Sequence, residues 1–308
     1  MHSSLEINSG AIDNADASPV ALPRPDGPTG AEHLDQSITV IEPTPGWRVI
    51  DFAELKKYRE LLYFLVWRDV KVRYKQTVLG AAWAILQPLA TMVVFSLFFG
   101  RLAELGSEGI PYPLFVFGAI LPWLFFSNSI AQAGNSVVNS QNLVTKVYFP
   151  RLFIPVSSVV AGLVDFAIAF GMLIVLMAYY GQMPGVGVLL LPAILGMLVL
   201  AAVGVGTLLA ALTVAYRDFR HVIPFMIQLW MFATPCIYMP PTTIESPRWH
   251  DVLPLNPAYG LIANFRAAAL GMPLDWYSLT VSSVVSLIIL IFSCLYFRRV
   301  ERSFADII

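Results

Sequence analysis

Residues 67–80 read WRDVKVRYKQTVLG, and four cations fall within eight of these positions. The run of basic residues ends at Lys75, and from Val78 to Leu102 the chain is almost wholly apolar. A stretch of that length can cross the roughly 30 Å hydrocarbon core of a bilayer as a helix. The sequence therefore predicts a basic helix directly before a first membrane span. The four cations are Arg68, Lys71, Arg73 and Lys75.

The whole chain has the composition of an integral membrane protein. Its 308 residues are 57% hydrophobic and 13% charged, with a mean hydropathy of +0.70, whereas an ordinary globular domain is about 45–50% apolar and about 25% charged. The net charge of -1 gives no indication of nucleic acid or of an acidic substrate. Cys236 and Cys294 lie far apart in apolar segments, so we expect neither a disulfide framework nor a thiolate metal site.

The chain before the first span divides into two predicted parts. Residues 1–50 are polar and rich in Pro, Asp, Ser and Gly, which favours a mostly disordered cytoplasmic tail without a signal peptide. Residues 51–77 are predicted to form an amphipathic helix in the membrane interface, capped by Asp51 with Glu54 in the capping-box position. The apolar stripe of this helix comprises Leu55, Tyr58, Leu62, Leu65, Val66 and Val70.

Residues 78–308 are predicted to form a six-span domain, so the expected fold class is an all-α integral membrane protein. Ala202, Gly206 and Ala210 recur at every fourth position of the fourth span, which favours close helix packing. The Pro-rich segment 241–276 contains a helix-like run that is too short to span, and we expect it to lie on the outer leaflet or to re-enter it. The run is 257–270, closed by Gly271, and the spans are 79–101, 112–134, 152–180, 186–214, 222–240 and 277–297.

The distribution of Lys and Arg indicates the orientation. The helix at 54–75 holds seven, the 135–151 and 215–221 loops hold two each, and the C-terminal tail holds three. On the other side of the membrane the predicted topology places Arg101, Arg248 and Arg266. By the positive-inside rule, both termini are expected to be cytoplasmic.

The sequence contains no recognisable catalytic constellation. Its four histidines lack metal-ligand spacing, and no G-x-x-x-x-G-K-[ST] phosphate loop is present, so we expect no catalytic residue and no metal site. If the protein uses ATP, another chain must bind it. One ionisable residue, Asp165, lies deep in a predicted span and is alone there. We interpret it as a structural group, hydrogen-bonded or protonated, and a transport role is the alternative.

Two groups of residues are candidates for binding. Aromatic side chains in and near the spans can stack on sugar rings, although an interfacial belt or plain packing explains any one of them as well. In the loop 139–151, an apolar patch at 147–149 precedes Pro150 and is typical of a docking surface. The aromatic candidates for a substrate path are Trp83, Tyr112, Trp123, Phe125, Phe126, Trp230, Tyr238 and Tyr259.

An ordered series of motifs resembles the ABC-2 type permeases that export bacterial cell-surface polysaccharides. The resemblance covers roughly residues 45–305, and the series is far more specific than any one of its members. In order, the motifs are Tyr58-Arg59-Glu60-Leu61-Leu62, residues 68–80, Trp83, Gln87-Pro88, Lys146, residues 148–151, Tyr216-Arg217-Asp218, Leu255-Asn256-Pro257 and Phe265-Arg266.

The resemblance implies a half-transporter in the bacterial inner membrane. Two copies of the permease would pair with two copies of a separate ABC ATPase, which would bind ATP and Mg2+, and the loop between spans two and three would insert into that ATPase. The substrate would be an undecaprenyl-diphosphate-linked polysaccharide, most specifically O-antigen. Its sugars would pass between the subunits, and its head group would meet Arg68, Lys71, Arg73 and Lys75. The implied docking residues are Asn142, Lys146, Val147, Tyr148, Phe149, Arg151, Arg217 and Asp218.

Three other functions stay open on the sequence alone. A membrane enzyme acting on lipid-linked substrates would need clustered carboxylates or histidines, which the sequence lacks. An ion-coupled flippase would need a paired charge relay within the membrane, and a lone Asp165 speaks against it. An ABC-2 permease for drugs or other lipids is excluded less firmly.

Overall fold

The computed structural model describes residues 58–75, 80–102, 109–146, 149–237 and 247–301, all of which belong to one compact unit, Trp47–Ile308. Every regular element in these ranges is helical, which confirms the all-α fold class. The predicted tail at 1–50 and the predicted helix cap at Asp51 lie outside the described residues.

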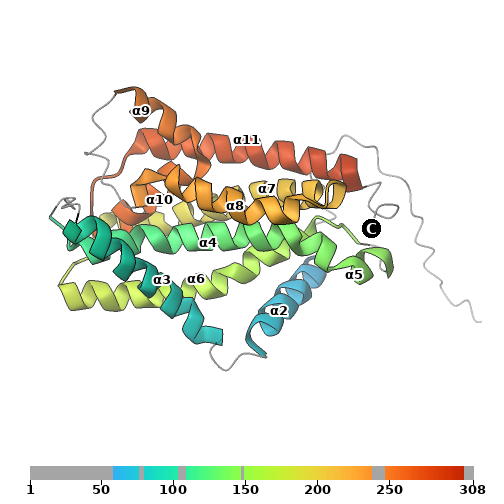
Figure 1. The fold of residues 1–308 in the computed structure, drawn as a ribbon, viewed down its shortest axis with the longest axis horizontal. Helices are drawn as coiled ribbons and strands as arrows, with labels where there is room; N and C mark the ends of the chain where they lie inside the picture. The colour runs from blue at the N-terminus through green and yellow to red at the C-terminus, as the bar shows by residue number, and fades with distance from the viewer. Residues whose placement is uncertain (1–57, 76–79, 103–108, 147–148, 238–246, 302–308) are drawn as a thin grey trace, which may run out of the picture. The chain divides into compact units, whose positions relative to one another are not determined.

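The helices follow the predicted segments closely, apart from the fifth (Figure 1). A basic helix, α2, is followed by long apolar helices, and shorter elements join them. In chain order the elements are α2 (Arg59–Lys75), α3 (Gly80–Phe95) with the π-helical turn η1 (Ser96–Leu102), α4 (Tyr112–Asn139), α5 (Gln141–Lys146), α6 (Phe153–Tyr180), η2 (Val186–Leu190), α7 (Leu191–Ala215), α8 (Phe219–Phe232), η3 (Pro235–Ile237), α9 (Pro247–Val252), η5 (Leu253–Leu255), α10 (Pro257–Leu270) and α11 (Trp276–Glu301).

Five segments of the described chain are long and apolar enough to cross a membrane, and the chain is a multi-pass membrane protein. They are 82–100, 112–139, 153–180, 186–215 and 276–301. The predicted fifth span, 222–240, is not among them. There α8 has 14 residues, or about 21 Å of helix, and Ala233 and Thr234 separate it from η3.

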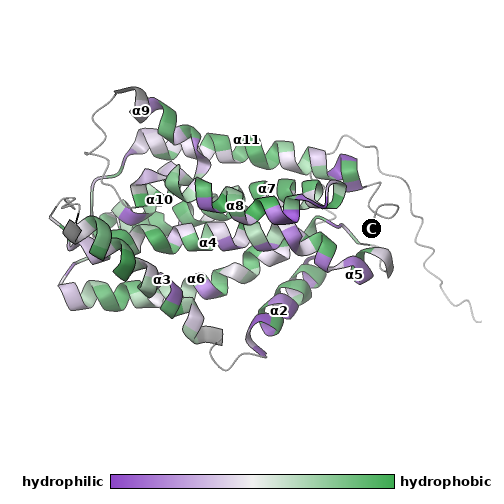
Figure 2. Ribbon diagram, viewed as in Figure 1, coloured by the Kyte–Doolittle hydropathy of each residue, from purple (hydrophilic) through white to green (hydrophobic). Residues whose placement is uncertain are grey.

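Helix α4 lies at the centre of the bundle and contacts α3, α6, α7, α8 and α10 (Figure 1). Most of its side chains are buried, including Phe115, Phe117 and Phe126. Figure 2 shows α4, α6, α7 and α11 as largely hydrophobic, whereas hydrophilic residues gather on α2 and α5. A helix that is apolar around its circumference is suited to the middle of such a bundle.

Small residues bring α7 close to α4, as their spacing predicted. Ala202 and Ala210 are fully buried. A Cβ added at Gly206 would lie 2.6 Å from the Cβ of Ala133 on α4, closer than two carbon atoms can approach. The row of small residues on α7 therefore sets how closely α7 and α4 pack.

A second hydrophobic cluster, separate from the core around α4, joins residues of several helices at one end of the bundle. It includes Leu65 of α2, Val144 of α5, Phe153 of α6, Val214 of α7 and Phe297 of α11. The exposed residues Arg217 and Arg220 follow α7 directly, and Arg298 and Arg299 close α11. We call this end of the bundle the basic end and the opposite one, which carries α10, the distal end.

The distal end contains the predicted short helix, α10. Asn256 caps it by accepting a hydrogen bond from Ala258 N at 3.1 Å, and Gly271 ends it in the left-handed conformation, with φ of 75°. The sequence predicted the end at Gly271 and the start at Pro257, whereas the cap by Asn256 was not predicted. Asn256 Oδ1 also accepts from Trp230 Nε1 at 2.8 Å, and this bond ties α10 to α8.

Candidate functional site

Helix α2 lies against the first half of α6 through polar contacts. Ser157 Oγ donates to Asp69 Oδ2 at 3.0 Å, and Asp69 Oδ1 also accepts from Arg68 Nη2 at 2.8 Å. Leu65 of α2 is buried in the second hydrophobic cluster, with Leu62 packed against it. Part of the predicted apolar stripe therefore faces protein, and placement of α2 in the membrane interface stays a prediction.

The carboxylate of Asp165, halfway along α6, is the centre of this contact. Arg73 Nη1 forms an ion pair with Asp165 Oδ2, and Tyr74 Oη donates to Asp165 Oδ1. Arg73 Nη2 also donates to Gln132 Oε1 of α4. The expectation that Asp165 is alone is therefore wrong, whereas its interpretation as a hydrogen-bonded structural group is consistent with this geometry.

The pairing reduces the cost of placing a charge in a membrane span. An isolated carboxylate at the bilayer centre costs on the order of 2.5–3.5 kcal/mol on insertion scales. Here the guanidinium of Arg73 neutralises it, and the side chains of Arg73 and Asp165 are 21% and 33% exposed. A pair that is partly hydrated avoids most of the desolvation penalty of a fully buried one.

The pKa of Tyr74 is raised above its ordinary value by its surroundings. Burial is the main cause, followed by the hydrogen bond that its hydroxyl donates to Asp165 and by the negative charge of that carboxylate. The positive charge of Arg73 acts in the opposite direction, and its effect is smaller. Tyr74 therefore stays protonated and keeps its donor role at neutral pH.

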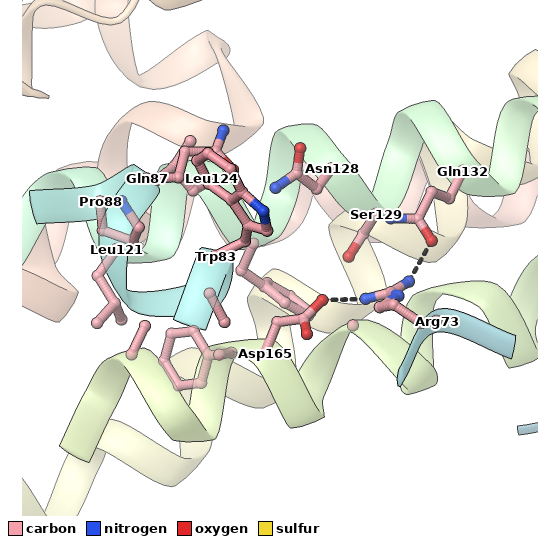
Figure 3. Close-up of a pocket in the computed structure, with 15 residues that line it drawn as sticks. Arg73, Trp83, Gln87, Pro88, Leu121, Leu124, Asn128, Ser129, Gln132 and Asp165 are labelled. Atoms are coloured by element: carbon pink, nitrogen blue, oxygen red, sulfur yellow. Dashed lines mark hydrogen bonds and ion pairs between the residues drawn. The ribbon is translucent and has the colours of Figure 1, made fainter. Parts of the chain in front are cut away.

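A cavity of about 380 Å³ lies beside this network, between α3, α4 and α6 (Figure 3). The ion pair of Arg73 and Asp165 borders it, and Figure 3 shows the two side chains facing each other below Ser129 and Gln132. The other polar groups that line it are Gln87, Asn128, Ser129, Gln132 and the indole of Trp83. Leu121, Leu124, Phe125, Phe166 and Pro88 supply most of the apolar wall.

The aromatic residues that were candidates for a substrate path do not form one surface in this structure. Trp83 is 55% exposed and lines the cavity, as does Phe125. Trp123, Phe126 and Tyr259 are buried in the core of their own chain. Tyr112 stacks on Phe115, Trp230 makes an edge contact with Phe126, and Tyr238 lies outside the described residues. Of the set, Trp83 is the most accessible aromatic beside a polar cavity.

The four predicted head-group cations have different surroundings. Arg73 is turned towards Asp165, and Arg68 is paired with Asp69. Lys71 is exposed and lies over the ring of Trp67, with 5.3 Å from its Nζ to the ring centroid. Lys75 is also exposed. Lys71 and Lys75 therefore remain the better candidates for contact with a lipid head group.

The predicted docking residues that the structure describes lie at the basic end. Asn142, Arg217 and Asp218 are exposed, whereas Phe149 is only 5% exposed and belongs to the second hydrophobic cluster. Burial of Phe149 contradicts the expectation of an exposed apolar patch at that position, because its ring packs within the second hydrophobic cluster. Val147, Tyr148 and the side chain of Lys146 lie outside the described residues.

Two hydrogen-bonded links join the loops of the basic end. Arg151 Nη1 donates to the backbone oxygen of Glu301 at 2.7 Å, which ties the start of α6 to the end of α11. Arg220 Nη2 donates to Asn139 Oδ1 at 2.9 Å, which ties α8 to the end of α4. These links were not predicted, since nothing in the sequence indicates which loops meet.

The residues that sequence reasoning missed are Tyr74, Gln132, Asn128 and Ser129. Each belongs to a segment whose pattern of charge or hydropathy does not single it out. The spacing of Asn128, Ser129 and Gln132 within one turn of an apolar span was a usable signal, because polar side chains in a span tend to face protein or a cavity.

The fold and this site define a class: a multi-pass helical membrane protein with a polar cavity among its spans and a basic end joined by hydrogen-bonded loops. Comparison with known proteins makes the assignment specific. The family model described as ABC-2 type transporter matches residues 60–270. The chain belongs to this family, whose members are membrane components of transporters.

Similarity to individual proteins supports the assignment to this family. The O-antigen export system permease protein RfbA of Myxococcus xanthus is 35% identical over 70% of this chain and 82% of its own length. A protein of the same description from Klebsiella pneumoniae is 26% identical over 81% of this chain and 95% of its own. The polysialic acid transport protein KpsM of Escherichia coli is 22% identical over 77% of this chain and 92% of its own length.

Proposed function

We propose that this chain is the membrane-spanning permease subunit of an ATP-driven exporter that moves a lipid-linked cell-surface polysaccharide, most specifically O-antigen, across the bacterial inner membrane. The observation that carries the proposal is the 35% identity to an O-antigen export permease over 82% of that protein. A relative named for polysialic acid transport supports the wider class of polysaccharides.

The proposed assembly has two copies of this chain and two of an ABC ATPase, which binds ATP and Mg2+. The exposed residues Asn142, Arg217 and Asp218 are part of the proposed docking surface, together with the predicted residues 146–148. Support comes from the Arg220–Asn139 link, which keeps the two loops together. In this proposal the basic end faces the cytoplasm, and α8 with η3 makes the remaining crossing as a broken span.

Removal of the gene from its source strain tests the proposal. We expect the long-chain ladder of lipopolysaccharide to disappear from gels while the lipid-linked polymer accumulates inside the cell. Re-expression of this chain restores the ladder only when a functional ATPase partner is present. An unchanged amount of surface polymer in the deletion strain would contradict the proposal.

An ion-coupled flippase is the second candidate, and the pairing of Asp165 with Arg73 favours it more than the sequence did. The two functions differ in their energy source. If the polymer is still exported when the partner ATPase carries an inactivating substitution at its catalytic carboxylate, and export stops when the proton gradient is collapsed, the flippase is correct. The opposite pattern supports the ABC exporter.

A further inference from the structure

We propose that the cavity between α3, α4 and α6 is a binding site for a neutral pyranose ring of the exported glycan. The inference rests on the proposed function, since it places one sugar of that substrate within a single subunit. It differs from a path along aromatic walls between two subunits, because it places the sugar among α3, α4 and α6 of a single chain.

The hydroxyl of Ser129 is the observation that points to a ligand. Ser129 is 1% exposed, and its Oγ has no hydrogen-bond partner among the described residues. Figure 3 shows it at the cavity, between Asn128 and Gln132. A buried polar group is normally hydrogen-bonded because the loss of water is otherwise uncompensated. A bound hydroxyl group would supply the missing partner.

The backbone of α6 approaches Ser129 closely at Gly162, which also lines the cavity. A Cβ added at Gly162 would lie 2.9 Å from Ser129 Oγ. Any larger residue would therefore press on the hydroxyl. Gly162 thus lets α6 lie against Ser129 at this point of the cavity wall.

The rest of the lining suits a sugar. Gln87 and Asn128 are exposed primary amides, which both donate and accept hydrogen bonds, as each sugar hydroxyl does. The indole of Trp83 offers an apolar face with a polar edge. The volume, about 380 Å³, lies at the small end of the roughly 300–1,000 Å³ of small-molecule sites, so it fits a ring or two and not a long polymer segment.

The charges favour a neutral ring over a diphosphate. The positive charge of Arg73 is already neutralised by Asp165. A dianion in the cavity would lie beside that carboxylate, and repulsion between like charges opposes binding. A neutral polyol avoids this repulsion and can still donate to the carboxylate or accept from the guanidinium.

The test uses the full chain with its partner ATPase in lipid nanodiscs. Saturation-transfer NMR is recorded with the methyl α-pyranosides of mannose, glucose and galactose, and inorganic pyrophosphate is followed by its phosphorus line width. We expect at least one pyranoside to bind. Ser129→Ala should weaken that binding about five- to tenfold, the contribution of one hydrogen bond, and Trp83→Ala should weaken it at least as much. Trp249→Ala, an exposed tryptophan in a different cavity at the distal end, should leave it unchanged.

The stability of the variants separates binding from folding. Ser129→Ala removes an unsatisfied hydroxyl, so we expect its melting temperature to be equal to that of the wild type or higher. Absence of binding by all three pyranosides, or binding that neither variant weakens, would overturn the inference. Binding of pyrophosphate that depends on Ser129 would also overturn it, since the site would then be an anion site. In each of these cases, loss of surface polymer on gene deletion would leave the proposed function standing.

Discussion

Arg73 of α2 forms an ion pair with Asp165 of α6, 92 positions further along the chain. The basic helix that precedes the first span is therefore fixed to the middle of the third. Tyr74 binds the other oxygen of the same carboxylate, and Gln132 of α4 binds the same guanidinium. One carboxylate thus organises the contact of three helices beside the polar cavity.

A double-mutant cycle should show that the two charges depend on each other. We expect Arg73→Gln and Asp165→Asn each to lower stability by about 1–3 kcal/mol, because each leaves its partner in a partly buried position without a countercharge. The double variant should lose less than the sum of the two. Denaturant unfolding of the purified protein in detergent measures these free energies, and strictly additive losses would mean that the pair contributes no coupling.

Alkaline pH should lower the stability of the protein through Tyr74. The pKa of Tyr74 is raised in the folded state, so the stabilisation from this group is complete below the ordinary tyrosine pKa of about 10. That stabilisation is lost as the pH rises from there towards the folded-state pKa, because the unfolded chain releases the proton first. We expect the wild type to lose more stability than Tyr74→Phe between about pH 10 and 11. Parallel pH profiles for the two proteins would exclude this role.

Gly260 should be one of the positions least tolerant of substitution at the distal end. A Cβ added there would lie 2.1 Å from the backbone oxygen of Ser278, so α10 could not stay against α11. The same contact lets Gly260 N donate to Ser282 Oγ at 3.1 Å. We expect Gly260→Ala to cost at least about 3 kcal/mol.

Gly171 provides the matched control for that substitution. It also lies within a long helix, α6, but a Cβ there would meet nothing within 4 Å. Because alanine is a better helix former, Gly171→Ala should leave stability unchanged or raise it by up to about 1 kcal/mol. If both variants unfolded at the same denaturant concentration, the close approach of α10 to α11 would be wrong.

Hydropathy and punctuation predicted much of this fold because they depend on local sequence. The long apolar runs gave the bounds of α4, α6 and α11 to within a few residues, and Pro257 with Gly271 gave those of α10. The predicted fifth span, 222–240, is not confirmed, because its apolar composition continues past Phe232, whereas α8 ends there. Hydropathy does not detect this helix end, beside which Asn256 Nδ2 donates to Ala233 O and Thr234 Oγ1.

The candidate site could be predicted only in part, because its contacts join distant segments. Trp83 and Asp165 were identified as unusual, one for its ring and the other for its charge. Their neighbours could not be predicted from one sequence. Helical periodicity shows which residues share a face of a helix, but it does not show which other helix packs against that face. Arg73 was grouped with Lys71 and Lys75 by proximity in sequence, and packing against α6 separates it from them.

The cations of α2 should divide into two functional groups when they are neutralised separately. Lys71 and Lys75 are exposed, so Lys71→Gln with Lys75→Gln should leave stability within about 0.5 kcal/mol of the wild type. Attraction to anionic head groups is worth about 1 kcal/mol for each cation near the membrane surface, so the double variant should bind anionic vesicles about 10- to 30-fold more weakly and export less polymer. Arg73→Gln should show the reverse pattern, with lower stability and a smaller change in vesicle binding per folded molecule. Vesicle flotation and denaturant unfolding of both variants provide the comparison. If neutralising Lys71 and Lys75 destabilised the protein as much as neutralising Arg73, the exposed lysines would have a structural role, and the head-group interpretation would fail.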